Sequence, residues 1–448
     1  MQNLHAKNLV IGFGKAGKTL AADLAKHGEE VILAETSAEM YGGTCINIGC
    51  IPSKKLLVEG HDRALCQHQG AAVFDAAMTA KNDLVAKLRA ANFHKVDDLA
   101  GARVITAEAR FEDEHTVLLS GRDGEYRVSA ERIFINTGSL PAKLDIEGAD
   151  GERVYDSTGL LALAARPERL VIIGGGYIGL EFAFMFQAFG SEVTILDSSD
   201  TFLPREDRDI AEEMLHIMQS KGIRVVQTAH ALSIKHHSHS STVHTDQGEF
   251  EAEAVLVAIG RRPNTASLAL ENAGIALSER GFIQTDDKLR VKNHIWAMGD
   301  VAGSPQFTFI SLDDYRIVRS QLLGDGKRST ADRAVFPTCV FTEPPLAQIG
   351  LTESRARSKG LNIRVAAFKA ADIPKAKVLR QTDGLLKAVV DADSSKILGV
   401  TLFCAEAHEL INLFKMAMDN GIGAEYLKNQ IFTHPSMAEG LNDLFVGF

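Results

Sequence analysis

Short apolar runs followed by glycines divide much of the chain into two similar repeats. In the first repeat an apolar strand, a glycine turn, a helical pattern and a second apolar strand follow one another, over residues 8–11, 12–17, 18–27 and 31–35. The same order returns over residues 170–173, 174–179, 180–189 and 193–197. Apolar strands that alternate with helices are typical of a parallel sheet covered on both faces. The pattern therefore predicts an α/β fold that contains two Rossmann-like domains.

The rest of the chain fits around these repeats. Alternating apolar and polar positions predict short strands within 101–135 and 223–260, and a further strand ends at Gly299-Asp300. The polar stretch 324–332 is typical of a linker, and alternating strands with two helical stretches follow it. We predict a first domain split around a second, and then an α+β domain. Their segments are 1–152 with 267–335, 153–266, and 336–448.

Both glycine turns carry a Gly-x-Gly-x-x-Gly sequence, and an acid ends the second strand of each repeat. The two sets are Gly12, Gly14, Gly17 with Glu35, and Gly174, Gly176, Gly179 with Asp197. From first glycine to acid, both sets span 23 positions. Such glycines allow a tight turn, a close approach to a pyrophosphate and close packing of helix on strand, while the acid binds a ribose diol. One such turn alone can be merely glycine-rich, but two with matched acids predict two dinucleotide sites.

Composition and charge exclude several other classes of protein. The 448 residues include 48 Lys and Arg against 58 Asp and Glu, a net charge of −10. An acidic chain is a poor ligand for nucleic acid or anionic membranes, and no apolar run approaches the ~18–20 residues of a membrane span. The start of the sequence offers no signal peptide, and five cysteines do not make a disulfide framework. We therefore expect a cytoplasmic protein with no nucleic-acid or membrane partner.

Cys45 and Cys50 are the sharpest chemical signal, because they lie five positions apart where a helix is expected to begin. In a regular helix their Cα atoms would be roughly 8–9 Å apart, whereas a disulfide needs about 4.4–6.8 Å. The pair can close only if the first turn is distorted, and Gly49 and Pro52 suit that distortion. A strained, easily reduced bridge suits catalysis rather than structure. A metal-binding pair or two unrelated buried thiols remain the alternatives.

Other polar groups have simpler interpretations. Four histidines form a polar hairpin, which we interpret as a solvated tip rather than a metal site: His236, His237, His239 and His244. Asp313 and Asp314 fit solvated acids or a helix cap. The isolated cysteines are expected to be buried apolar thiols: Cys66, Cys339 and Cys404.

Taken together, these motifs resemble the pyridine nucleotide–disulfide oxidoreductases, which include dihydrolipoamide dehydrogenase, glutathione reductase and mercuric reductase. The resemblance covers the whole chain and rests on the two dinucleotide turns, Gly-Gly-Thr-Cys-x4-Cys, Ala-x-Gly-Asp300 and His434-Pro-x-x-x-Glu439. It implies FAD in the first domain, NADH (with NADPH possible) in the second, and dimerisation through the third.

The resemblance also assigns roles to individual residues. It implies that FAD is held by Gly12, Gly14, Gly17, Glu35, Gly43, Thr44, Lys54, Thr137, Gly138 and Asp300. It implies that the nicotinamide dinucleotide is held by Gly174, Gly176, Tyr177, Gly179 and Asp197, and Gly260 closes that unit as a further cofactor-binding position.

The catalytic residues implied by the resemblance lie in three parts of the sequence. Lys54 and Glu181 match an ion pair beside the flavin, and Cys45–Cys50 matches the redox disulfide, with Cys50 toward the flavin and Cys45 toward the substrate. His434 and Glu439 match a catalytic base and its orienting carboxylate, which come from the partner subunit. A homodimer is therefore expected to be the active enzyme.

Two departures from the family bear on the electron acceptor. The chain ends without the cysteine pair common in mercuric reductases, and residues 306–315 differ from the small-residue helix of glutathione and lipoamide enzymes. Other stretches resemble a branch of the family that resists reactive chlorine and is associated with Cu(II) reduction: 40–50, 202–209, 310–318 and 431–435. We therefore expect Cu(II) as acceptor under oxidative stress, with Cys45 and Cys50 as transient copper ligands. A reductase of a small disulfide, or a redox or metal sensor without turnover, are the alternatives.

Overall fold

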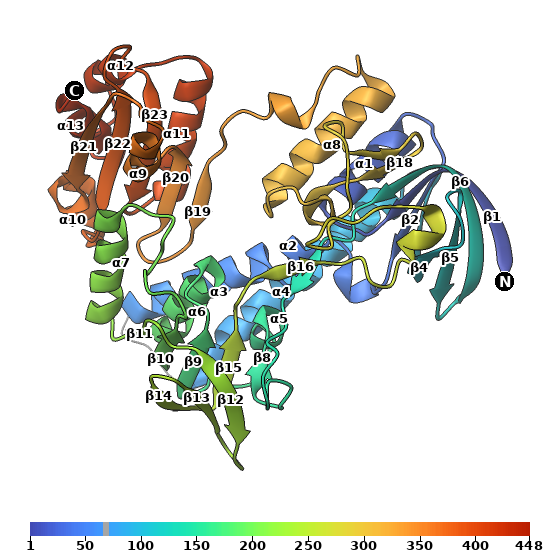
Figure 1. Ribbon diagram of the computed structural model, residues 1–448, viewed down its shortest axis with the longest axis horizontal. Helices are drawn as coiled ribbons and strands as arrows, with labels where there is room; N and C mark the ends of the chain where they lie inside the picture. Colours follow the sequence, from blue (N-terminus) through green and yellow to red (C-terminus); the bar gives the residue numbers. More distant parts are fainter. Residues whose placement is uncertain (66–70) are drawn as a thin grey trace.

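The computed structural model describes residues 1–65 and 71–448. Three main sheets with their covering helices occupy separate regions, as Figure 1 shows. Cys66, which the sequence predicts to be a buried thiol, lies outside the described residues. The α/β fold class is confirmed, and the positions of the domain boundaries remain predictions.

The first sheet joins the amino-terminal repeat to a strand pair from residues 290–297 in the order β17-β18-β6-β1-β2-β3, with β5 also on β6 and β4 on β5. The strands are β1 (Gln2–Ile11), β2 (Val31–Glu35), β3 (Ala102–Thr106), β4 (Glu108–Phe111), β5 (Thr116–Gly121), β6 (Gly124–Ile135), β17 (Arg290–Lys292) and β18 (Ile295–Ala297). The associated helices are α1 (Lys15–Lys26), α2 (Thr44–Asn47), α3 (Cys50–Leu65), α4 (Ala71–Asp97) and α8 (Thr308–Leu323). The parallel pairing of β1 with β2 and β6 places the glycine turn after β1 at the carboxyl edge of the sheet.

The second sheet is built on the second repeat, and all its pairs are parallel, in the order β11-β10-β9-β15-β8. Its strands are β8 (Val154–Tyr155), β9 (Arg169–Ile173), β10 (Glu192–Leu196), β11 (Arg224–Val226) and β15 (Ala254–Val257). A smaller sheet contains β12 (Ala231–His236), β13 (Ser241–Thr245) and β14 (Gly248–Ala252), and the helices are α5 (Ser157–Leu160), α6 (Tyr177–Ala188) and α7 (Arg208–Ser220). The chain passes between the first and second sheets twice, and the two connecting segments pair as antiparallel strands, β7 (Ser139–Pro141) with β16 (Arg261–Pro263).

The third sheet is antiparallel, in the order β19-β20-β23-β22-β21. Its strands are β19 (Thr338–Val340), β20 (Leu346–Gly350), β21 (Ile363–Lys369), β22 (Leu385–Asp391) and β23 (Ile397–Phe403). Its helices are α9 (Glu353–Ser358), α10 (Pro374–Leu379), α11 (Ala407–Asp419), α12 (Ala424–Asn429) and α13 (Gly440–Val446). Short 3-10 helices are η1 (Ala38–Met40), η2 (Leu270–Ala273), η3 (Gly299–Ala302), η4 (Thr330–Asp332) and η5 (Ala370–Asp372).

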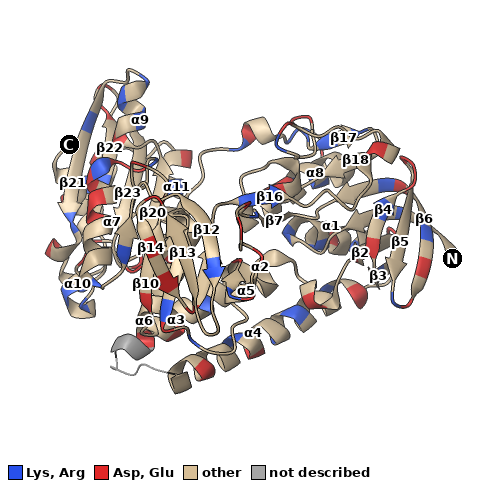
Figure 2. Cartoon of the chain, turned by 60° about the horizontal axis from the view of Figure 1, so that its bottom comes forward, with Lys and Arg blue, Asp and Glu red and all other residues tan. Residues whose placement is uncertain are grey.

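Charged residues of both signs lie along the long helix α4, as Figure 2 shows. Among the described residues, no helix has the length and apolar character that a membrane crossing requires.

Asp313 and Asp314 correct an expectation from the sequence, because they neither cap nor interrupt a helix. Both lie inside α8, and Asp314 is completely buried. The Asp314 carboxylate accepts a hydrogen bond of 2.7 Å from the Gly299 amide and pairs with Arg333. Asp313 pairs with the same arginine at 2.9 Å. Asp314 therefore holds α8 against the segment that follows β18, and both acids hold Arg333 on α8, which are long-range roles that the local sequence does not indicate.

A buried cation joins the second sheet's helices to the third sheet. The Lys387 side chain, on β22, is 6% exposed and lies 3.2 Å from Asp207, 2.9 Å from Asp209 and 2.8 Å from Glu353. The hydrogen bond from Lys387 holds the pKa of Glu353 below its ordinary value. Burial by itself would raise the pKa of Asp207. Hydrogen bonds from two α9 amides and the charge of Lys387 outweigh burial and keep this pKa below its ordinary value. The acids and Lys387 are thus ionised, and their attraction holds α7 and α9 against the third sheet.

We predict that Lys387→Met lowers the free energy of unfolding by about 3–5 kcal/mol at pH 7, because it leaves the buried Asp207 carboxylate without its cation. Wild-type stabilisation from these acids is present above their unfolded pKa of about 4 and is lost as the pH falls through the lower folded pKa. The difference between variant and wild type should therefore shrink in acid. Urea unfolding from pH 7 to pH 3, with the exposed Lys396→Met as control, measures it. An equal loss in both variants would contradict the assignment.

Candidate functional site

An interruption between two helices brings Cys45 and Cys50 together. α2 ends at Asn47 and α3 begins at Cys50, so the expected single helix is broken at Ile48 and Gly49. A Cβ on Gly49 would lie 2.9 Å from the Thr44 carbonyl oxygen, so a larger residue would push the segments apart. In the structure the two thiols are not bonded covalently, and they hydrogen-bond to each other. The distortion predicted from their spacing is present.

The two sulfurs have opposite electrostatic environments. The hydrogen bond from Cys45 lowers the pKa of Cys50 to about 6 in spite of partial desolvation of this exposed residue, with further help from Thr308 and Lys54. Cys50 is also the first residue of α3, where the helix N-terminus favours negative charge. The same thiol–thiol bond, together with burial, raises the pKa of Cys45. In the reduced pair, therefore, Cys50 carries the charge and Cys45 the proton.

The predicted Lys54–Glu181 pair lies beside the thiols. Its Nζ and Oε2 atoms are 2.6 Å apart, and the other carboxylate oxygen of Glu181 accepts a 3.0 Å bond from the Phe341 amide. The Lys54 ammonium also lies 4.7 Å from the centre of the Phe341 ring. One ion pair thus connects α3, α6 and the third sheet, and its cation stabilises the Cys50 thiolate.

The first glycine turn closes on a buried asparagine that sequence reasoning missed. Asn136 accepts a 2.9 Å bond from the Gly17 amide and donates one of 2.6 Å to the Met298 carbonyl. A Cβ on Gly12 or Gly14 would lie 2.4 Å from Asn136 oxygens, which explains both glycines. The turn is thereby bonded to β6 and β18. Asn136 directly follows the buried strand β6, and this position is the only feature of the sequence that could have indicated its contact with the glycine turn.

The acid of the first repeat lies at the turn, as its spacing predicted. Glu35 accepts 2.8 Å bonds from the amides of Phe13 and Thr36, and burial raises the pKa of its carboxyl. Gly43 is packed directly against the same turn, because a Cβ there would lie 2.8 Å from the Gly14 Cα atom. Thr44 follows it as the first residue of α2.

Asp300 and the other predicted residues near it gather where β6 and β18 end. Ser139 donates a 2.6 Å bond to the Asp300 carboxylate and accepts one of 2.8 Å from Arg261, whose guanidinium was not predicted to be part of the site. The Thr137 hydroxyl donates 2.7 Å to the Asn264 carbonyl. Gly138 and Gly260 have positive φ and open space where a Cβ would stand.

The second glycine turn repeats the first. The Asp197 carboxylate lies over it, since a Cβ on Gly175 would be 2.6 Å from Oδ2, and burial raises the pKa of Asp197. Gly179 packs against Gly174, whose carbonyl oxygen would lie 2.2 Å from an added Cβ, while the space at Gly176 is open. Tyr177 begins α6, and its hydroxyl donates a 2.7 Å bond to buried Glu206.

Both turns suit a dinucleotide. Gly14 and Gly176 are the N-caps of α1 and α6 and offer no capping side chain of their own, although side chains of Ser311 and Asn136 accept bonds from the Ala16 and Gly17 amides of α1. Free amides at such a helix end bind phosphate oxygens. Lys18 adds a half-buried ammonium beside the first turn, bonded to the Gly42 carbonyl, and burial lowers its pKa to about 8. These features fit the pyrophosphates of FAD and of a nicotinamide dinucleotide.

His434 and Glu439 are bonded to each other and lie apart from the thiols of the same chain. The His434 Nδ1 and Glu439 Oε2 atoms are 2.6 Å apart, and the imidazole is 71% exposed. Glu439 directly precedes α13, which Figure 1 shows at the outer left edge of the third-sheet region, well away from the central α2. Within one chain, the structure does not bring this pair to Cys45.

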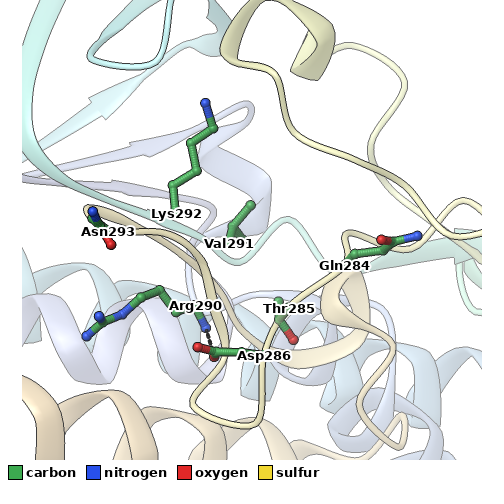
Figure 3. Close-up of a pocket in the computed structure, with 7 residues that line it drawn as sticks. All are labelled: Gln284, Thr285, Asp286, Arg290, Val291, Lys292 and Asn293. Atoms are coloured by element: carbon green, nitrogen blue, oxygen red, sulfur yellow. Dashed lines mark hydrogen bonds between the residues drawn. The ribbon is translucent and has the colours of Figure 1, made fainter.

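Cys339 lies near the Lys54–Glu181 pair, which affects the pKa of its thiol, whereas the other singled-out residues that the structure describes do not join the site. Burial raises the pKa of both Cys339 and Cys404 to about 12, Cys404 being completely buried. His236 bonds the Gly148 carbonyl at 2.8 Å, and among the described residues no group of three or more His, Cys, Asp or Glu could hold a metal. An open hollow lies in the loop 284–293 shown in Figure 3, where Asp286 accepts bonds from amides of its own loop. It contains none of the predicted site residues.

Comparison with known proteins gives consistent matches. The family "Pyridine nucleotide-disulphide oxidoreductase" matches residues 6–314, and its dimerisation domain matches residues 336–445. The "Probable pyridine nucleotide-disulfide oxidoreductase RclA" of Escherichia coli (strain K12) is 50% identical over 98% of both chains. A Staphylococcus aureus mercuric reductase is 32% identical over 97% of this chain and 80% of its own. The structure of a Cu(II) complex of the HOCl-induced flavoprotein disulfide reductase RclA from E. coli superposes with a TM-score of 0.95, at 49% identity over 99% of both chains.

Proposed function

The chain belongs to the pyridine nucleotide–disulfide oxidoreductases and is an enzyme that uses FAD and a nicotinamide dinucleotide; we propose that it reduces Cu(II) with electrons from NADH. The contact between Cys45 and Cys50 at the start of α3 carries this proposal, because it supplies a dithiol that can be oxidised and reduced again. The net reaction is NADH + 2 Cu²⁺ → NAD⁺ + 2 Cu⁺ + H⁺. We place it in the cytoplasm, in defence against reactive chlorine.

The residues divide the cofactor work between the two turns. FAD would be held by the first glycine turn (Gly12, Gly14, Gly17), Glu35 and Asp300. The nicotinamide dinucleotide would be held by the second glycine turn, which starts at Gly174, and by Asp197. When bound, FAD would supply the redox chemistry that links oxidation of the nicotinamide, a hydride donor, to reduction of the disulfide. Glu181 fixes the Lys54 side chain beside Cys50, where it favours the thiolate.

The dithiol then meets the metal. Reduced Cys45 and Cys50 give one electron to each of two Cu(II) ions, lose the one proton that Cys45 holds, and return to the disulfide. Thiolates are soft ligands that favour Cu(I) over Cu(II), so the pair binds the reduced ion preferentially. Cys45, which holds the proton of the pair, needs a base before it can act.

His434 is the base that suits this step, and we propose that it comes from the partner subunit. Its orientation is fixed by Glu439, yet it is exposed and remote from Cys45 of its own chain. Large apolar side chains are also exposed on the third sheet's helices and on the segment before His434, among them Ile431 at 93% and Met416 at 61%. Apolar exposure of this kind marks an interface, which agrees with the matched dimerisation domain.

Two observations support Cu(II) as the electron acceptor: similarity to a relative that binds Cu(II), and a sequence difference from other members of the family. The structure of the E. coli relative has been determined as a Cu(II) complex. Residues 306–315 also differ from the small-residue helix expected of glutathione and lipoamide enzymes, which disfavours a small disulfide as acceptor.

We predict that purified enzyme turns over Cu(II) many times per active site with NADH, and faster than lipoamide or glutathione disulfide. Cys45→Ser and Cys50→Ser should each reduce this rate at least about tenfold, since either change removes the dithiol. Cys404→Ala, which removes a buried thiol elsewhere, should keep the rate. Full Cu(II) activity in both cysteine variants would refute the dithiol route, and much faster turnover of lipoamide would make the protein a disulfide reductase.

We predict a preference for NADH over NADPH of at least about tenfold in kcat/KM. The Asp197 carboxylate lies over the turn and would repel a 2′-phosphate. Arg208, a nearby cation, is already bonded to the carbonyls of Phe202 and Leu203. Asp197→Ala should bring the two values closer together, and Asp200→Ala, an exposed acid of the same loop, serves as control. Equal or better use of NADPH by the wild type would overturn the assignment.

We predict that subunits carrying Cys45→Ser and subunits carrying His434→Ala restore activity when mixed. In a hybrid dimer with a shared site, one of the two sites has both residues, so an equal mixture should regain about a quarter of wild-type activity. Activity is measured after subunit exchange has been verified by differently tagged chains. No recovery in verified hybrids would show that each chain forms its own site.

A further inference from the structure

The start of α8 lies against the Cys50 sulfur. α8 spans Thr308–Leu323, and its first residue places its hydroxyl oxygen 3.6 Å from the Cys50 sulfur. The same hydroxyl interacts with the Cys45 thiol. This is also the stretch, 306–315, in which the sequence departs from the small-residue helix of related disulfide reductases.

We propose that Thr308 is a catalytic residue whose hydroxyl donates a hydrogen bond to the Cys50 sulfur and holds the negative charge there after the disulfide opens. The proposal rests on the redox role of Cys45 and Cys50 given above. Opening the disulfide takes two electrons, from the nicotinamide donor through FAD, and one proton. The products are one thiol and one thiolate. A hydroxyl within hydrogen-bond distance of the Cys50 sulfur stabilises the charge on that sulfur.

The chemistry of the contact fixes the direction of the hydrogen bond. A thiolate has no proton and is only an acceptor, whereas a threonine hydroxyl donates one hydrogen. Bonds from neutral donors to charged acceptors are stronger than neutral ones. Once Cys50 is charged, Thr308 must therefore be the donor, and the charged form is the one that it stabilises.

Position in the helix leaves this hydroxyl free for the sulfur. Threonines inside helices bond the carbonyl four residues earlier, as Thr19 and Thr79 do here with Lys15 and Asp75. Thr308 is the first residue of α8, so no preceding helical turn offers it a carbonyl. The stacked rings of Phe307 and Phe309, 5.1 Å apart, hold the helix start on either side of it.

Two helix N-termini also converge on one sulfur. Cys50 is the first residue of α3 and Thr308 the first residue of α8. Each N-terminus carries partial positive charge, and the effect is confined to the first turn. The Thr308 hydroxyl joins these two ends directly at the atom that becomes charged, and this is why we assign it a role at Cys50 rather than a purely structural one.

The test compares Thr308→Val with Thr308→Ser in the complete enzyme with bound FAD. Val keeps the shape and removes the donor, while Ser keeps the donor. After anaerobic reduction by two electrons, we expect the long-wavelength thiolate-to-flavin absorbance of Thr308→Val at pH 6 to fall about two- to tenfold, since a charged hydrogen bond is lost. The disulfide should also become harder to reduce, with a more negative midpoint potential. Thr308→Ser should restore most of both signals.

Thr79→Val, which removes a hydroxyl bonded only within α4, is the matched control and should leave both signals unchanged. Equal absorbance and potential in Thr308→Val and wild type, with equal FAD content, would overturn the role of Thr308. Loss of the signals in Val and Ser alike would also overturn it, because a donor would then not be the cause. Absence of the absorbance in the wild type would instead overturn the proposed redox function itself.

Discussion

Gly49 separates two helices that would otherwise be one, and the contact between two sulfurs depends on that break. With a Cβ at this position, the Thr44 carbonyl would be forced away and Cys45 with it. Because the break lets Cys50 begin a new helix, the same residue also receives the favourable field of α3. Unequal environments then follow for the two thiols: one is poised as a thiolate and the other keeps its proton. The remaining site residues act on a pair that this one glycine makes possible.

Contacts between distant segments hold the surroundings of the pair in place. Asn136 bonds the first glycine turn to the strand end at Met298, and buried Asp314 bonds the next residue, Gly299, to α8. The two connections fix the start of α8, and therefore Thr308, relative to the dinucleotide turn. On the other side, Glu181 ties Lys54 to the third sheet through the Phe341 amide. The charges beside the thiols are thus positioned by all three sheets.

Features that depend on local spacing were predictable from the sequence. The matched glycine turns and their acids follow from a repeat of strand, turn and helix, and the distortion at Gly49 follows from the reach of a disulfide compared with a helix. The positions of Thr308, Asn136 and Lys387 were not predictable, because their partners lie far away along the chain: Cys50, Met298 and Glu353 respectively. Asp314 was misinterpreted for the same reason, since an acid in a helix has the same local pattern whether it is solvated or completely buried. The Lys54–Glu181 pair came from family resemblance, which supplies the long-range pairing that local pattern lacks.

The central claim is that Cys45 and Cys50 form a redox centre in addition to the flavin. An anaerobic titration with dithionite, followed by absorbance, counts the electrons that the enzyme accepts. A flavin with a disulfide takes four electrons, which is two equivalents of dithionite per bound FAD, and the long-wavelength band should be greatest after the first equivalent. In the double variant Cys45→Ser, Cys50→Ser a single equivalent should suffice. Full reduction of the wild-type enzyme by one equivalent, with no long-wavelength band, would contradict the account.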